Sequence, residues 1–239
     1  MPFITEKPMP VPLNQTLNQT LNQTLNQTPN QTHMQAAPGS SEQTSTETQD
    51  NTQPQHFMIY KPYGYLIQFV AERRKRKPLL GELADFPSGI MAIGRLDHDS
   101  EGLLLLTTSG KTSHAVRSKS VEKEYYLQLD GEITDQAIAS LCEGVEIGIK
   151  GEKYLTLPCR AQRLAQAPSL PGRGRKIRDA RHGPTSWLAI TITEGKNRQL
   201  RKMTAAVGFA TLRLVRVRIG DIHLGTLQPG EVRQLQTLG

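Results

Sequence analysis

The first 55 residues restrict where this chain can fold. Residues 13–32 repeat the tetrapeptide LNQT four times and end in PNQT, and the sequence up to Pro54 is rich in Gln, Thr and Ser. Such a segment cannot bury enough apolar surface to offset the conformational entropy lost on ordering. A period of four residues is also too short for a stacking solenoid repeat. We therefore predict a disordered tail over residues 1–55 and one folded domain over residues 56–239.

The predicted domain is strongly basic. The whole chain has 29 Lys and Arg against 22 Asp and Glu, a formal charge of +7. The tail has one Lys and four acidic residues, a net −3, so the remainder carries +10. This excess favours a polyanionic partner, because neutralised phosphates release counterions. A solvated surface that is merely basic is the alternative that charge alone leaves open.

The cysteine spacing and the hydropathy of the chain predict a cytoplasmic location. Cys142 and Cys159 have neither metal-binding nor redox spacing, which is typical of reduced cysteines in a cytoplasmic protein. The N-terminus has no apolar run long enough for a signal peptide, and the chain has no stretch of 18 apolar residues. We expect a soluble cytoplasmic monomer with no membrane partner.

Short apolar runs alternate irregularly with two helical patterns. The first helix, 134–144, has Thr134 as a candidate N-cap and Gly144 as a stop, and the second, 197–208, is bounded by Asn197 and Gly208. The irregular order and hairpin-like spacings predict an α+β fold with a mixed, largely antiparallel sheet. Strands are expected at 56–60, 65–70, 90–93, 103–107, 123–129, 145–149, 153–159, 187–193 and 211–219.

Several cationic segments could face a phosphate backbone. Arg198, Arg201 and Lys202 fall opposite the apolar stripe of the second helix. Strand 211–219 alternates arginines with apolar residues, with one slip near 214–215, which predicts one buried and one basic face. The basic run at 72–77 and the long Arg-rich loop at 163–184 fit either phosphate contact or ordinary solvation.

Cofactor chemistry has little support in the sequence. Neither Gly-rich phosphate-binding motif is present, the six histidines have no metal-ligand spacing, and no serine lies in a nucleophile elbow. We therefore expect no cofactor and no metal. Carboxylate chemistry on a polyanion is the remaining hypothesis.

The segment GRLDHDSEGLLLLTTSG, residues 94–110, offers the carboxylates for that chemistry. Asp97 follows one predicted strand and precedes another, a rigid connection that suits a reactive group. Neighbouring residues of an extended segment point to opposite sides, so His98 is a poor candidate base for Asp97. The alternative is structural, with Asp97 or Asp99 accepting backbone amides in a turn.

The segment resembles the signature of pseudouridine synthases, in the branch of ribosomal small-subunit synthase A and large-subunit synthases B, E and F. Three further blocks agree in order: Lys61-Pro62-Tyr63-Gly64, KEYYLQLDG at 123–131, and TSWLAITITEGKNRQLRKMTAAVGFATLRLVRVRIGD at 185–221. The resemblance covers about residues 56–235, and the basic insertion before Pro184 is most similar to large-subunit synthase E. Tyr60 and Thr108-Ser109 depart from the common pattern, and the N-terminal RNA-binding domain of many relatives has no counterpart.

The resemblance implies an activity and a set of site residues. It implies isomerisation of a uridine to pseudouridine in ribosomal RNA, either free or in an assembly intermediate. The family's nucleophile matches Asp97, its active-site tyrosine matches Tyr125, and the basic residue that ion-pairs with the aspartate matches Arg201. Arg95 would help to flip or hold the RNA. Further RNA contacts are expected from Lys61, Arg198, Lys202, Arg175 and Lys176.

Two other functions use parts of the same site. A non-catalytic RNA-binding protein needs the cations but not Asp97, and an N-glycosidase shares the carboxylate but releases the base. Asp99 is the second candidate carboxylate, read as an acid that caps the loop.

Overall fold

The computed structural model describes residues 53–70, 77–117, 121–178 and 180–238. The predicted tail up to residue 52 and most of the basic run at 72–77 lie outside these residues. In the described part of the chain, no helix has the length and hydrophobicity needed to cross a membrane.

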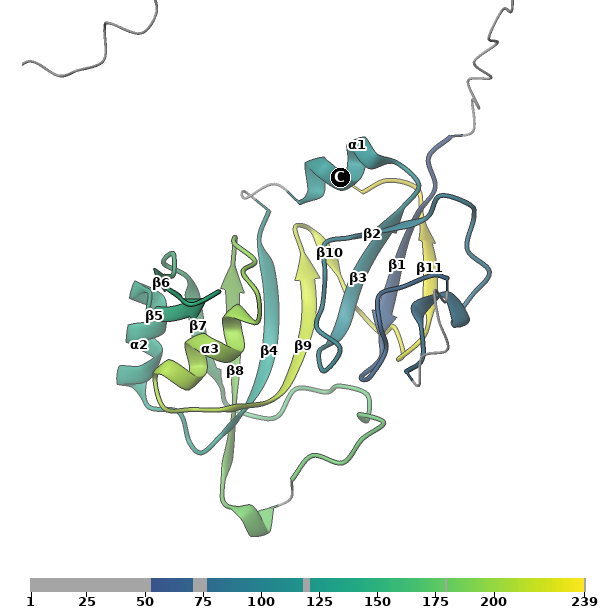
Figure 1. The fold of residues 1–239 in the computed structure, drawn as a ribbon. Coiled ribbons are helices and arrows are strands. Elements are labelled where there is room, and N and C mark those ends of the chain that lie inside the picture. The colour runs from purple at the N-terminus through teal and green to yellow at the C-terminus, as the bar shows by residue number, and fades with distance from the viewer. Residues whose placement is uncertain (1–52, 71–76, 118–120, 179, 239) are drawn as a thin grey trace, which may run out of the picture. The chain divides into compact units, whose positions relative to one another are not determined.

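A nine-stranded sheet forms the framework of the domain (Figure 1). Its order is β11-β1-β3-β9-β4-β8-β7, with β2 added beside β3 and β10 beside β9. Neighbouring strands run antiparallel except β3 and β9, which are parallel. The α+β class with a mixed, largely antiparallel sheet is thus confirmed. The strands are β1 (His56–Lys61), β2 (Met91–Ile93), β3 (Glu101–Thr107), β4 (Lys123–Asp130), β7 (Arg160–Leu164), β8 (Thr185–Ile192), β9 (Thr211–Ile219), β10 (Ile222–His223) and β11 (Val232–Leu235).

Within the described residues, three α-helices and a small hairpin accompany the sheet. Figure 1 shows α2 and α3 together with the β5–β6 hairpin beside the β4–β8–β7 half. The boundaries of α2 are as predicted, because the Thr134 side chain accepts a hydrogen bond from the Ala137 amide and Gly144 ends the helix with a positive φ. The elements are α1 (Gly110–Val116), α2 (Asp135–Glu143), α3 (Gln199–Ala206), β5 (Glu146–Ile149), β6 (Glu152–Leu155) and two 3₁₀ turns, η1 (Leu80–Glu82) and η2 (Ala180–His182).

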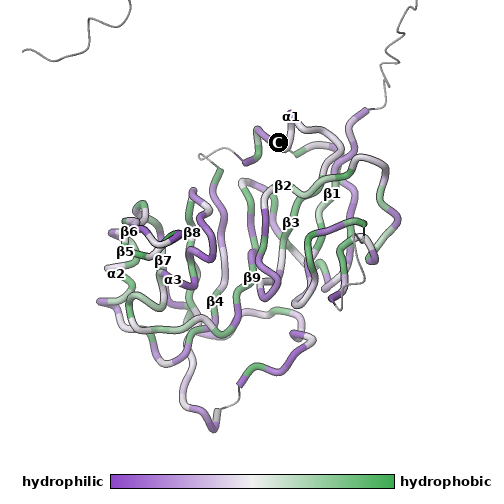
Figure 2. The backbone as a smooth tube through the Cα atoms, in the orientation of Figure 1, coloured by the Kyte–Doolittle hydropathy of each residue, from purple (hydrophilic) through white to green (hydrophobic). Residues whose placement is uncertain are grey.

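Burial on both faces of the sheet accounts for the four consecutive leucines of β3. Leu103 and Leu105 join the apolar cluster on one face of the sheet, and Leu104 and Leu106 join the cluster on the other. All four are completely buried. A strand covered on both faces loses the alternation of a half-exposed strand and becomes a continuous apolar run. Figure 2 shows this hydrophobic stretch along β3.

Gly102 allows the two halves of the sheet to meet. It pairs with Arg216 in the short parallel contact between β3 and β9. A Cβ at this position would lie 2.3 Å from the Arg216 carbonyl oxygen, and the backbone φ is +100°. Only glycine meets both conditions without a clash or backbone strain.

The prediction of one buried and one basic face for 211–219 is wrong. Arg213 and Arg216 are 6% and 4% exposed, because β9 lies in the middle of the sheet and both its faces are covered. The slip also lies elsewhere than predicted: the register with β4 shifts once between Glu124 and Tyr125 and once between Gln128 and Leu129. The first shift is a bulge that places Arg216 opposite Tyr125 and Arg218 opposite Glu124.

Other corrections concern short or irregular segments. Residues 65–70 form no named strand and make a single bridge, Leu66 to Leu79. The expected loop at 163–184 begins inside β7, and its arginines are partly used within the fold. Arg163 binds Asp135, Arg178 binds Asp130, and Arg173 donates to the Leu212 carbonyl while lying 3.9 Å from the centre of the Tyr63 ring. Arg173 and Arg178 therefore attach this loop to strands β9 and β4 of the sheet.

Candidate active site

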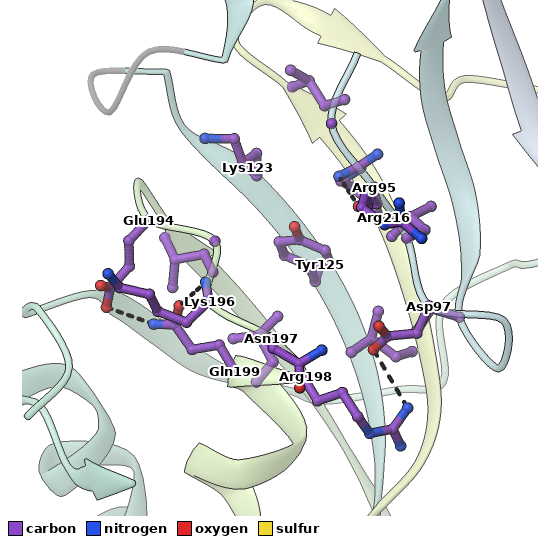
Figure 3. Close-up of a pocket in the computed structure, with 18 of the residues that line it drawn as sticks. Arg95, Asp97, Lys123, Tyr125, Glu194, Lys196, Asn197, Arg198, Gln199 and Arg216 are labelled. Atoms are coloured by element: carbon purple, nitrogen blue, oxygen red, sulfur yellow. Dashed lines mark hydrogen bonds and ion pairs between the residues drawn. The ribbon is translucent and has the colours of Figure 1, made fainter. Parts of the chain in front are cut away.

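A cavity of about 600 Å³ is lined by the three predicted catalytic residues (Figure 3). Its wall is built from the loop between β2 and β3, the starts of β4 and α3, the end of β8 and the middle of β9. Val116 at the end of α1 and Arg117, which follows it, also line the wall. Asp97, Tyr125 and Arg201, which are separated by up to about a hundred residues in the chain, all line it. In the described residues, no three His, Cys, Asp or Glu side chains are grouped to hold a metal ion.

Asp97 lies on the tight turn between β2 and β3. The Asp97 carbonyl accepts a hydrogen bond from the Ser100 amide at 3.0 Å, which closes the turn. About a third of the Asp97 side chain is exposed, and its nearest cation is Arg198, with Nη1 3.5 Å from Oδ2. The carboxylate therefore faces the cavity with one long ion pair.

The Lys-Pro-Tyr-Gly block, residues 61–64, packs against this turn and supports it. The Gly64 amide donates to the His98 carbonyl at 2.9 Å, which joins the block to the turn that carries Asp97. The positive φ of Gly64 lets the chain reverse there. Two blocks that are far apart in the sequence thus form one structural unit.

Lys61 is inside this unit, and its predicted RNA contact is wrong. It is 0% exposed, and its Nζ donates to the carbonyls of Pro62 at 3.0 Å, His98 at 3.4 Å and Ser100 at 2.8 Å. Burial lowers the pKa of Lys61 to about 8, although nearby carboxylates, Glu101 foremost, oppose the shift. Lys61 holds the Asp97 turn in place and cannot reach a ligand.

This titration predicts a pH dependence of stability. The pKa of Lys61 is about 8 in the fold against an ordinary 10.5, so between these values the unfolded chain binds more protons and stability rises with pH. Lys61→Met lacks this titration. From pH 8 to pH 9, the free energy of unfolding of the wild type should therefore rise by about 1 kcal/mol relative to the variant. Urea unfolding of both proteins between about pH 6.5 and about pH 9.5 measures this difference. A difference that stays constant over the whole range would contradict it.

Tyr125 points into the cavity from β4 (Figure 3). It is 8% exposed and lies between Ile190 of β8 and Arg216 of β9 in the sheet register. A ring held this rigidly offers an aromatic surface on which a planar group can stack.

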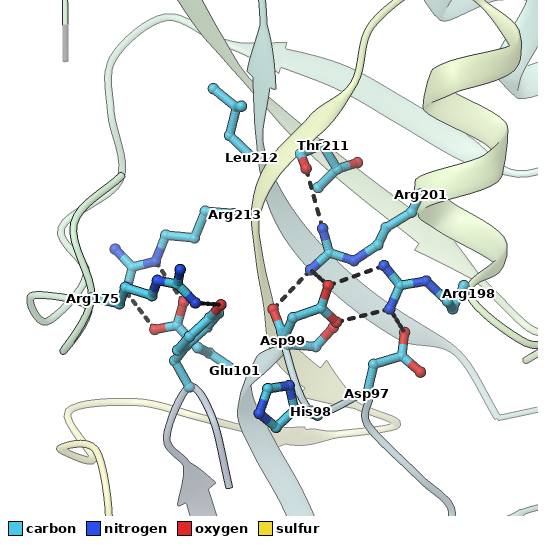
Figure 4. Close-up of polar contacts among 12 residues, drawn as sticks. Asp97, His98, Asp99, Glu101, Arg175, Arg198, Arg201, Thr211, Leu212 and Arg213 are labelled. Atoms are coloured by element: carbon cyan, nitrogen blue, oxygen red, sulfur yellow. Dashed lines mark hydrogen bonds and ion pairs between the residues drawn. The ribbon is translucent and has the colours of Figure 1, made fainter. Parts of the chain in front are cut away.

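Arg198, which precedes α3, and Arg201, within α3, both contact Asp99 (Figure 4), whereas the sequence predicts that Arg201 pairs with Asp97. Arg198 binds Asp99 with both ends of its guanidinium, at 2.9 and 3.0 Å, and Arg201 lies 3.5 Å from the same carboxylate. Arg201 also donates to the Asp99 carbonyl at 2.8 Å and the Thr211 carbonyl at 3.2 Å. The expected ion pair of Arg201 with Asp97 is thus replaced here by a contact with Asp99.

The start of α3 also differs from the prediction. Arg198 and not Asn197 is the N-cap, and its backbone is left-handed, with φ +50°. The Gln199 side chain accepts from the Lys196 amide at 2.9 Å and donates to Glu194, whose other oxygen accepts from the Tyr154 hydroxyl. This network accounts for the EGKNRQ block: the buried Glu194 fixes the turn from which Arg198 projects.

The remaining predicted cations fall into two groups. Arg95 lines the cavity and its side chain is exposed. Arg175 and Lys176 are exposed but outside the cavity, where Arg175 donates to the Tyr63 hydroxyl at 3.4 Å. Lys202 is also outside, because its Nζ donates to the Gly148 carbonyl of β5 at 2.7 Å.

Sequence reasoning missed several residues of the cavity. The alternation in 211–219 predicts an exposed Arg216, yet Arg216 lines the wall and donates to the Leu103 carbonyl at 2.7 Å. The sequence indicates only a strand at Lys123, whose side chain lines the cavity and donates to the carbonyls of Val121 and Thr193. Glu194 had a usable signal, because a lone acid in a basic block needs several donors when it is buried.

The sequence profile of the RNA pseudouridylate synthase family matches residues 55–206. The ribosomal large subunit pseudouridine synthase E of Xanthomonas campestris pv. campestris is 43% identical over 178 residues, which cover 74% of this chain and 92% of that protein. The protein of the same name from Vibrio parahaemolyticus is also 43% identical, over 182 residues that cover 74% of this chain and 71% of that protein.

A solved structure agrees with these sequence matches. A crystal structure of a pseudouridylate synthase aligns with 77% of this chain and 70% of its own, at a TM-score of 0.61 and 30% identity. The fold, the profile and the relatives point to one conclusion: the chain belongs to the RNA pseudouridylate synthase family and is an RNA pseudouridine synthase.

Proposed function

We propose that this enzyme converts one uridine of large-subunit ribosomal RNA to pseudouridine, with Asp97 as the nucleophile. The observation that carries the proposal is the meeting of Asp97, Tyr125 and Arg201 in one cavity from three separate elements. The relatives named as large-subunit synthase E support the choice of RNA. The mixed charge of the wall suits a nucleotide, which brings both a neutral base and a phosphate.

The chemistry assigns a role to each residue. The bond between C1′ and N1 of the uridine breaks, the base turns over, a bond forms between C1′ and C5, and the C5 proton is lost while N1 gains one. The Asp97 carboxylate drives the cleavage by covalent attack or by stabilising positive charge on the sugar. Tyr125 packs on the extruded uracil, since a uridine in folded RNA must leave its stack to react. Arg201 and its neighbour Arg198 place positive charge beside the carboxylate turn.

The RNA would be held by exposed cations around the mouth of the cavity and beyond it. Arg95 and Arg198 lie on the cavity wall, and Arg175 and Lys176 extend the basic surface along the 163–184 loop. Such contacts act through phosphates and weaken with salt. We further propose that residues 56–239 carry the whole activity, so that the repeat tail is dispensable.

Site-resolved pseudouridine mapping of total RNA tests the function. Cells with and without the gene are compared, and the deletion strain is complemented with the full chain, with residues 56–239 or with the Asp97→Asn chain. We expect one site in large-subunit ribosomal RNA to disappear and to return with both active forms. Loss of a small-subunit or transfer RNA site would overturn the substrate, and no change at any site would overturn the function.

A further inference from the structure

Tyr63 packs against the turn that carries Asp97. Its ring lies 6.1 Å from the His98 ring, between ring centres, and the two planes are inclined by 49°. The next residue, Gly64, donates its amide to the His98 carbonyl at 2.9 Å. One ring contact and one backbone hydrogen bond thus join Tyr63 and its neighbour to the residue that follows Asp97.

The 163–184 loop contacts the same tyrosine. The Arg173 guanidinium lies 3.9 Å from the centre of the Tyr63 ring, and Arg175 donates to the Tyr63 hydroxyl at 3.4 Å. A guanidinium over an aromatic face is attracted to the negative charge of that face, and partial burial strengthens the attraction. Tyr63 and Arg173 are both half-buried. The loop therefore reaches the Asp97 turn through one aromatic side chain.

This part of the loop is itself fixed to the central strand β9. Arg173 donates to the Leu212 carbonyl at 3.0 Å, and the Pro171 carbonyl accepts from the buried Arg213 at 2.8 Å. Both partners lie near the start of β9, inside the sheet. Arg173 thus has an anchored position from which it can hold the Tyr63 ring.

The carboxylate of Asp97 depends on its turn for its position. About a third of the Asp97 side chain is exposed, and its ion pair with Arg198 is 3.5 Å long. A side chain with such contacts is placed mainly by its backbone, which closes through the Ser100 amide on the Asp97 carbonyl. A displacement of about 1 Å at a reacting atom can lower a rate by about 100-fold. Contacts that hold the turn therefore affect the chemical step.

We propose that Tyr63 is a positioning residue that holds the Asp97 turn, and that Arg173 holds Tyr63 in place. The 163–184 loop then contributes to the rate of the reaction as well as to the binding of RNA. This inference rests on the proposed role of Asp97.

Single-turnover kinetics test the proposal, because the reaction releases the hydrogen at C5 of the uridine. The substrate is a transcript of large-subunit ribosomal RNA made with uridine tritiated at C5, at saturating enzyme. For Tyr63→Leu we expect the rate of tritium release to fall by about 10-fold, with RNA affinity within about threefold of the wild type. Tyr63→Phe keeps the ring between His98 and Arg173, so its rate should stay within about threefold of the wild type.

Variants of the loop show whether the two residues act together. Arg173→Met should lower the rate by about fivefold or more, because the ring loses its anchored partner. Tyr63→Leu/Arg173→Met should be no slower than Tyr63→Leu, since both changes remove the same contact. Arg163→Met is the matched control. It removes an equal charge from the same segment, where Arg163 binds Asp135, and should keep the wild-type rate.

Hydrogen exchange followed by mass spectrometry locates the effect in the molecule. In Tyr63→Leu and Arg173→Met, the Ser100 amide should exchange faster, because its bond to the Asp97 carbonyl closes the turn. The amides of α2 should exchange as in the wild type. Thermal melting shows which variants fold. If Tyr63→Leu does not fold, Arg173→Met tests the same contact without changing the residue that precedes Gly64.

Three results would overturn the inference. The first is a wild-type rate for Tyr63→Leu or Arg173→Met, and the second is a loss of RNA affinity at an unchanged rate, which would make the loop a binding element only. The third is a double variant whose loss equals the product of the two single losses, because Tyr63 and Arg173 would then act independently. An active Asp97→Asn enzyme would instead overturn the proposed function, and hydrogen exchange would still show whether Tyr63 holds the turn.

Discussion

Replacing Asp97 by asparagine is expected to lower the rate of pseudouridine formation by about 10⁴-fold or more. The change keeps the size of the side chain and removes its negative charge by replacing one carboxylate oxygen with an amide nitrogen. The single long contact to Arg198 contributes little to stability, because a third of the Asp97 side chain is exposed. The loss should therefore fall on the chemical step and leave folding unchanged.

Single-turnover tritium release and RNA binding by fluorescence anisotropy check this prediction together. The variant should bind the substrate RNA within about threefold of the wild type, because the change leaves every cation of the domain in place. Asp99→Asn is the matched control, because it removes an equal charge two residues away and should retain measurable activity. A rate for Asp97→Asn within about tenfold of the wild type would mean that the cavity uses another group.

Replacing Arg213 by methionine is expected to destabilise the fold by about 3–5 kcal/mol. Arg213 of β9 holds Glu101 of β3 through two hydrogen bonds, of 3.0 and 2.9 Å, and the two side chains are 7% and 2% exposed. Arg213 also donates to the Pro171 carbonyl at 2.8 Å, which attaches the 163–184 loop. The variant would leave a buried carboxylate without its main partner, and this accounts for most of the cost.

A double-mutant cycle with Glu101→Gln isolates the pair. The double variant has no unpaired buried charge, so we expect it to be more stable than Arg213→Met, with a coupling energy of about 2 kcal/mol or more. Urea unfolding at neutral pH gives the four free energies. Additivity within about 0.5 kcal/mol would show that the pair contributes no specific stability.

Some of the molecule can be derived from the sequence because the signals are local. The caps of α2 depend on residues within one helical turn of Thr134 and Gly144. Four consecutive leucines in β3 indicate a strand that is buried on both faces, as the structure has it. The turn that carries Asp97 is recognisable for the same reason, since it lies in one continuous segment between two strands. Edge strands such as β7, β10 and β11 carry no comparable pattern, because they are short and mostly exposed.

Composition and local patterns indicate the basic character of the domain, its α+β class and a turn between two strands that carries Asp97 and Asp99. Which charges meet depends on the three-dimensional packing of the strands and α3. Lys and Arg usually lie at the surface, yet Lys61 and Arg216 are both buried. Lys61 supports the turn that carries Asp97, and Arg216 forms part of the cavity wall. The pairing of Arg198 with Asp99 joins residues 99 positions apart. Such contacts depend on sheet register and on how a helix enters its turn, and no local pattern encodes either.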